Sequence, residues 1–174
     1  PDAGKSTLTE ALALHAGLIS EAGAIHGKAS RKSTVSDWMQ LEKDRGISVN
    51  SAALQFPYRD CVLNLLDTPG HADFSEDTYR VLAAVDCAIM LIDAAKGLEQ
   101  QTLKLFEVCR HRGIPIITVI NKWDRPGKDA LALMDEIAQR INLEPRPLTW
   151  PVGIAGDFRG VIERSSGEFI QFTR

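Results

Sequence analysis

Residues 63–70 read Leu-Asn-Leu-Leu-Asp-Thr-Pro-Gly, an apolar run that ends in an aspartate and a turn. Similar apolar runs alternate with amphipathic stretches along the chain, a pattern typical of βαβ units around a mostly parallel sheet. Open sheets of this kind bind ligands at the carboxyl ends of their strands. We therefore expect Asp67 to hold Mg²⁺ through water, and Gly70 to let a backbone N–H approach a phosphate. A simple strand-ending turn is the alternative, because Asp, Pro and Gly are common turn residues.

The first residues, Pro-Asp-Ala-Gly-Lys-Ser, match the second half of a phosphate-binding loop of the form G-x-x-x-x-G-K-[ST]. The first glycine of that loop would lie two positions before Pro1, so we expect the first strand to be missing from this sequence. Lys5 would reach the β- and γ-phosphates and take part in catalysis, while the Ser6 hydroxyl would ligate Mg²⁺. A plain helix N-terminus is the alternative. The residues expected around the phosphate oxygens are Asp2, Ala3, Gly4, Lys5, Ser6 and Thr7.

A third motif, Asn121-Lys122-Trp123-Asp124, follows another apolar run. The Asp124 carboxylate can accept hydrogen bonds from the N1–H and the exocyclic amine of guanine, and adenine offers no such pair of donors. Selectivity of this kind can reach about 10⁴-fold. Asn121 would tie this loop to the phosphate loop, and the stem of Lys122 would cover one face of the base. An exposed polar turn is the alternative, but the three motifs together predict a magnesium-dependent GTPase.

A long polar segment, residues 26–46, separates the first two motifs and is expected to be a functional loop. The motif Arg45-Gly46-Ile47-Ser48 closes this segment, and the Ser48 hydroxyl could coordinate Mg²⁺ while GTP is bound and release the segment after hydrolysis. His71 comes directly after the Asp-Thr-Pro-Gly turn and is the candidate for positioning the attacking water. Phosphoryl transfer needs mainly positioning and charge stabilisation from the protein.

The expected fold class is α/β, with the P-loop NTPase fold. Its sheet is expected to be mostly parallel, with one antiparallel hairpin and helices on both faces. Residues 1–150 are expected to form the GTP-binding domain, and residues 151–174 to begin an incomplete insertion or subdomain. The helices are expected over residues 6–14, 73–85, 99–112 and 129–141, and residues 37–43 are expected to be a short amphipathic piece within the long polar loop. The strands are expected over residues 48–56, 61–67, 87–92 and 114–120, with residues 57–60 connecting the hairpin.

Composition sets limits on other classes of function. The 174 residues are 44% hydrophobic and 25% charged, as in an ordinary globular protein, and the net charge is −3. That charge argues against a surface-wide basic footprint, so we do not expect DNA as a partner. No apolar run reaches the roughly 18 residues needed to span a bilayer, so we do not expect a membrane either. The three cysteines lie far apart without a CxxC pair. We expect them to be buried, reduced thiols of a cytoplasmic protein rather than zinc ligands or disulfides.

With these motifs in place, the chain resembles the translational GTPases, the ribosome-dependent factors that include elongation factor G. The motifs that carry the resemblance are residues 1–6, 45–48, 67–71 and 121–124. Within the family, the likeness is greatest to bacterial factors of the peptide-chain release factor three type. It is carried by residues 36–43, 55–61 and 73–80, and it is weakest over 11–35 and after about 156. Elongation factor G usually has threonine where Ser48 stands, and serine keeps the hydroxyl.

The resemblance implies a ribosome-dependent GTPase of translation termination that helps class I release factors to dissociate after peptide release. It implies that His71 orients the attacking water, and that the sarcin–ricin loop of ribosomal RNA helps to set this histidine. It also implies a structural monovalent cation near Asp2. The family's last guanine-contacting loop is expected beyond Arg174, so we expect residues 1–174 alone to bind GTP poorly or not at all.

Three alternatives stay open. An elongation-type or ribosome-protection factor of the same family would use the same chemistry on a different state of the ribosome. A non-hydrolysing binding module would use GTP only to set its affinity for a partner. A P-loop metabolic kinase is disfavoured by the guanine motif, residues 121–124, which an ATP-dependent phosphotransferase would not need.

Overall fold

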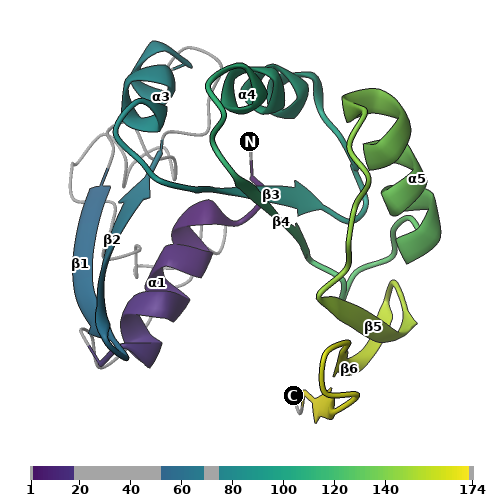
Figure 1. The fold of residues 1–174 in the computed structure, drawn as a ribbon. Helices are drawn as coiled ribbons and strands as arrows, with labels where there is room; N and C mark the ends of the chain where they lie inside the picture. The colour runs from purple at the N-terminus through teal and green to yellow at the C-terminus, as the bar shows by residue number, and fades with distance from the viewer. Residues whose placement is uncertain (1, 18–51, 69–74, 173–174) are drawn as a thin grey trace, which may run out of the picture. The chain divides into compact units, whose positions relative to one another are not determined.

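The computed structural model describes residues 2–17, 52–68 and 75–172 (Figure 1). The chain forms two compact units, with the division between Val85 and Asp86. The first unit contains α1 (Lys5–His15), β1 (Ala52–Tyr58), β2 (Cys61–Asp67) and α3 (Ser75–Leu82). The second contains β3 (Ala88–Asp93), α4 (Gln100–His111), β4 (Ile116–Asn121), α5 (Ala130–Ile141), β5 (Thr149–Ile154), β6 (Asp157–Glu163) and β7 (Phe169–Gln171).

Helix α1 begins directly after Gly4, which adopts a φ of 98°. Glycine takes this left-handed conformation without the steric cost that a Cβ atom brings. Thr9, Glu10 and Ala13 form the buried face of the helix, and the helix packs against β2. The helix predicted over residues 6–14 is therefore confirmed, and it starts at the lysine of the phosphate-binding motif.

Strands β1 and β2 form the predicted antiparallel hairpin, with Tyr58 opposite Cys61. Only Arg59 and Asp60 connect them, so the expected four-residue connection is wrong. Pro57 instead lies within β1 and faces Val62. Proline lacks an N–H donor, but edge strands tolerate it. The predicted strand over 61–67 is confirmed, whereas the expected start of its partner at residue 48 lies outside the described residues.

In the second unit, β3 and β4 are parallel, and Asp93 lies opposite Asn121 at their carboxyl ends. Residues of β3 alternate between buried positions, such as Met90 and Ile92, and Ile89, which is 43% exposed. Burial on both faces of this strand was expected and is not found in the described part of the chain. Helix α4 packs against β3 and α5, so α4 covers one side of β3.

Capping residues set the C-terminus of α4 and the N-terminus of α5. After α4, Gly113 adopts a φ of 68°. The next N–H, that of Ile114, donates to the Cys109 carbonyl at 2.9 Å, which is the hydrogen bond of a Schellman cap. Asp129 caps the N-terminus of α5, and its side chain accepts hydrogen bonds from the N–H groups of Leu131 and Ala132.

Strands β5, β6 and β7 form an antiparallel sheet after α5. The turn between β5 and β6 contains Gly156, with a φ of 99°. The compact unit continues through this sheet from residue 86. The expected division into domains at residue 150 therefore stays a prediction.

Of the three cysteines, only Cys109 is buried; Cys61 and Cys87 are exposed. The expectation of three buried thiols was wrong for these two, because Cys61 begins a strand at a surface turn and Cys87 precedes β3. Burial raises the pKa of the Cys109 thiol. Among the helices of residues 2–17 and 75–172, none has the length and apolarity needed to cross a bilayer.

Candidate GTP-binding and magnesium site

Lys5 lies in the first turn of α1, immediately after the left-handed Gly4. Burial lowers the pKa of its ammonium group, while the nearby carboxylates of Asp67 and Asp2 act in the opposite direction. The first and second motifs, 62 residues apart in sequence from Lys5 to Asp67, therefore meet in one place. A partly desolvated cation at a helix N-terminus suits a phosphate group.

The residues of this region also fit Mg²⁺. Asp67 is 5% exposed at the carboxyl end of β2, and Ser6 lies in the first turn of α1, the helix that packs on β2. Carboxylate and hydroxyl oxygens are ligands that Mg²⁺ prefers. The described residues contain no cluster of three or more His, Cys, Asp or Glu that could hold a metal ion. Phosphate oxygens and water would therefore have to complete the coordination, as is usual for Mg²⁺ beside a nucleotide.

The third motif begins the loop of residues 121–128, which we call the guanine loop after its predicted role. Asn121 ends β4, and Lys122 adopts a left-handed φ of 63°. Trp123 is 8% exposed and packs with Ala94 and Leu133. The next side chain, Asp124, is exposed. The buried indole anchors the loop while the neighbouring carboxylate remains accessible to a ligand.

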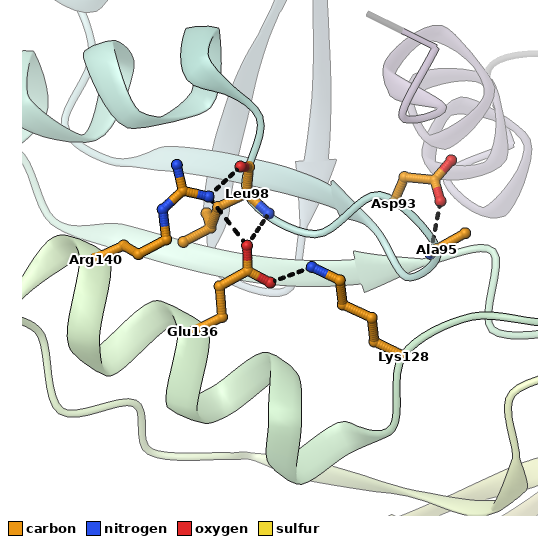
Figure 2. Close-up of polar contacts among 6 residues, drawn as sticks. All are labelled: Asp93, Ala95, Leu98, Lys128, Glu136 and Arg140. Carbon is orange, nitrogen blue, oxygen red and sulfur yellow. Dashed lines mark hydrogen bonds and ion pairs between the residues drawn. The ribbon is translucent and has the colours of Figure 1, made fainter.

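Asp93 lies beside this loop and forms an ion pair with it. Its Oδ2 atom is 3.0 Å from the Lys122 Nζ atom. Its Oδ1 atom accepts a 2.9 Å hydrogen bond from the Ala95 N–H, as Figure 2 shows. Burial by itself would raise the pKa of Asp93. The hydrogen bonds from Lys122, Ala95 and Lys96 outweigh burial, so the pKa lies below its ordinary value. Asp93 therefore carries a negative charge at neutral pH.

Glu136 of α5 connects the guanine loop to the segment after β3 (Figure 2). One carboxylate oxygen is 2.6 Å from the Lys128 ammonium, and the other accepts hydrogen bonds from the Leu98 N–H at 3.2 Å and from Arg140 at 3.1 Å. Arg140 also donates to the Leu98 carbonyl at 2.7 Å. Gly97 lies against this network, where a Cβ atom would collide with Glu136 and Lys128.

Backbone contacts hold the guanine loop on two further sides. The Lys128 N–H donates to the Ala94 carbonyl at 3.1 Å, and a Cβ atom on Gly127 would lie 3.0 Å from the same backbone. The Gly156 N–H, in the β5–β6 turn, donates to the Trp123 carbonyl at 3.1 Å. Segments that are remote in sequence thus determine where the loop lies.

The predicted site residues fall into three sets. The phosphate set, in the first unit, comprises Asp2, Ala3, Gly4, Lys5, Ser6, Thr7 and Asp67. The guanine set, in the second unit, comprises Asn121, Lys122 and Asp124. The predictions for Ser48, Gly70 and His71 lie outside the described residues.

Sequence reasoning missed the supports of the guanine loop, namely Asp93, Trp123, Glu136 and Gly156. Asp93 could have been found, because it follows an apolar run at the carboxyl end of a strand as Asp67 does, and the same rule applies to both. Glu136 and Gly156 give no comparable signal, since a glutamate in a helix and a glycine in a turn are common.

Comparisons with known proteins identify the family of this chain. The family described as the elongation factor Tu GTP binding domain matches residues 1–169. Proteins named peptide chain release factor 3 are similar over the whole chain. The one from Synechococcus elongatus is 60% identical over 174 residues, and the one from Microcystis aeruginosa is 58% identical. The chain spans about a third of these relatives, 31% and 32% of their lengths.

A crystal structure of a protein from Thermus thermophilus is also similar, with a TM-score of 0.87 and 27% sequence identity. The likeness covers 99% of this chain and 25% of that one. Together with the family match, it confirms the predicted α/β P-loop NTPase fold.

Proposed function

Because this chain belongs to the translational GTPases, through the GTP-binding domain that they share with elongation factor Tu, we propose that it is the GTP-hydrolysing part of a termination factor. In this proposal the parent protein promotes dissociation of class I release factors from the ribosome after peptide release. The observation that carries the proposal is 60% identity, across all 174 residues, to a protein named peptide chain release factor 3. The exposed Asp124, on a loop anchored from three sides, supports guanine as the base that is recognised.

The reaction is in-line attack of water on the γ-phosphate of GTP. Lys5, partly desolvated at the start of α1, neutralises charge on the β- and γ-phosphates. When bound, Mg²⁺ would neutralise further charge there and would be held by the Ser6 and Ser48 hydroxyls and, through water, by Asp67. His71 orients the attacking water. Gly70 gives a backbone N–H access to the γ-phosphate.

Three side chains choose the base. Asp124 accepts hydrogen bonds from guanine, Lys122 covers one face of the ring, and Asn121 stands beside them in the same motif. Guanine offers the Asp124 carboxylate two hydrogen-bond donors, whereas adenine would leave the carboxylate without them. The loss of these hydrogen bonds is the basis of selectivity.

The proposed partners follow from the similarity to release factor 3. They are the ribosome, with the sarcin–ricin loop acting on His71, and the class I release factors, all in the cytoplasm. A monovalent cation beside Asp2 is part of the same proposal. An elongation or ribosome-protection role remains the second candidate function.

The test uses the full-length parent protein. Ribosomes that have just released their peptide are loaded with a fluorescent class I release factor, and loss of the label is followed after the protein and GTP are added. Fast dissociation that requires GTP would support the proposal, and a His71→Ala variant should retain nucleotide affinity but lose ribosome-stimulated turnover. Intact turnover without dissociation would move the function to elongation or protection.

A further inference from the structure

Asp93 is a buried carboxylate at the guanine loop that has no role in the reaction described above. It ends β3, directly opposite Asn121 of β4. Its side chain is 8% exposed, and the Lys122 side chain that it contacts is 20% exposed. An ion pair this well shielded is screened much less by salt than a surface pair.

The two oxygens of Asp93 have separate partners. The Ala95 N–H, at 2.9 Å from Oδ1, fixes the orientation of the carboxylate relative to its own backbone. This leaves Oδ2 directed at the Lys122 ammonium, 3.0 Å away. The backbone continues the same alignment, because the Ala94 N–H donates to the Asn121 carbonyl at 3.0 Å. The position of Asp93 is thus set by the strand pair, and Asp93 in turn holds one lysine.

We propose that Asp93 is a positioning residue for guanine-nucleotide binding, acting through Lys122. This inference rests on the proposed function, in which the Lys122 stem covers one face of the base. A lysine side chain has many rotamers, and ordering it on binding lowers affinity. The Asp93 carboxylate holds the ammonium group at the end of the Lys122 side chain. The four methylene groups of that side chain then remain available to contact the base. The lysine is therefore ordered before the nucleotide arrives.

The test is a double-mutant cycle in the full-length protein, with dissociation constants for fluorescent GDP and melting temperatures. Asp93→Asn removes the charge but keeps an oxygen that can accept the Ala95 N–H. Lys122→Met removes the ammonium but keeps an unbranched stem. We expect Asp93→Asn to raise the dissociation constant about tenfold in the wild-type background, since one side chain must then be ordered on binding. In the Lys122→Met background, the same change should alter it less than about twofold.

A matched control comes from Asp157, whose carboxylate is 2.9 Å from Arg159 in an ion pair exposed to solvent. Asp157→Asn makes the same chemical change at a similar distance and should leave GDP affinity unchanged, because exposed pairs contribute little. If Asp93→Asn lowers the melting temperature too far for measurement, Asp93→Ser, with a shorter acceptor for the Ala95 N–H, goes through the same cycle.

Two results would overturn the inference. One is an unchanged GDP affinity in Asp93→Asn; the other is an equal loss in the wild-type and Lys122→Met backgrounds, which would mean that Asp93 acts on the fold and not through the lysine. Failure of the proposed function has a different signature. In that case the wild-type protein itself would not bind GDP, and the Asp124→Ala substitution would not change the measured GDP binding.

Discussion

The phosphate side and the guanine side of this protein are built in different ways. On the phosphate side, Gly4, Lys5 and Ser6 are consecutive, and a single strand end adds Asp67. On the guanine side, residues 121–128 are held by Asp93, Glu136 and Gly156, which lie on three other segments. A helix N-terminus supplies its own backbone donors, whereas a loop after a strand must obtain its support from elsewhere. Substitutions on the phosphate side should therefore change nucleotide affinity without changing the stability of the fold. Substitutions on the guanine side should change both together.

The largest effect is expected from Trp123→Ala. The indole is 8% exposed at the centre of the packing beneath the guanine loop, and truncating a buried aromatic side chain costs about 3–5 kcal/mol. Chemical denaturation should register that loss together with weaker GDP binding. Trp150→Ala, the same change at a partly buried position in β5, should cost less. Equal losses in the two variants would contradict a special anchoring role for Trp123.

The next largest effect is expected from Lys5→Met, which should weaken nucleotide binding without destabilising the fold. Removing the cation takes away a charge-assisted contact to phosphate, so GTP and GDP affinity should fall on the order of 100-fold. The free energy of unfolding should stay the same or rise, since burial already disfavours the charged form of this lysine. Lys104→Met, an exposed position on α4, serves as the control in nucleotide titrations. A large loss of stability in Lys5→Met would remove the contrast between the two sides.

Gly97→Ala should have a moderate effect on the guanine side. Gly97 has a φ of 71°, and an added Cβ atom would collide with Glu136 and Lys128. Gly113→Ala is a close control, because its φ is 68° and nothing lies within 4 Å of the added atom. Both variants should lose about 1–2 kcal/mol to backbone strain, and Gly97→Ala should lose more through the displaced ion pair. Identical unfolding free energies in the Gly97→Ala and Gly113→Ala variants would mean that displacing the Glu136 ion pairs does not destabilise the fold.

The smallest effect concerns pH. Burial alone would raise the pKa of Glu136, but Lys128, the Leu98 N–H and Arg140 lower it below its ordinary value of 4.5. A lowered folded-state pKa stabilises the fold at pH values above 4.5, and this contribution is lost as the pH falls through the folded-state pKa. The difference in unfolding free energy between the wild type and Glu136→Gln should therefore shrink on acidification from pH 7 to below 4.5. Urea titrations across that range would measure it, and a constant difference would rule out the linkage.

The sequence by itself determined the nature of the chemistry. Lys5, Asp67 and Asp124 were predicted as site residues because each belongs to a motif with a specific chemistry that adjoins a helix or strand. Local features also set the limits of two helices, namely the cap at Asp129 and the left-handed Gly113. These features depend on neighbours within a few residues, so a single sequence is enough to read them.

Only the tertiary structure decided what holds the guanine loop. The ion pair of Asp93 with Lys122 joins residues 29 positions apart, and the contact of Gly156 with Trp123 joins residues 33 apart. The exposure of Cys61 and the inclusion of Pro57 in β1 were likewise settled by strand pairing. Such contacts depend on which elements the fold brings together, and residue type and spacing do not encode that in any local pattern. The motifs therefore predicted which groups act, and the packing of distant segments set where the loop of residues 121–128 stands.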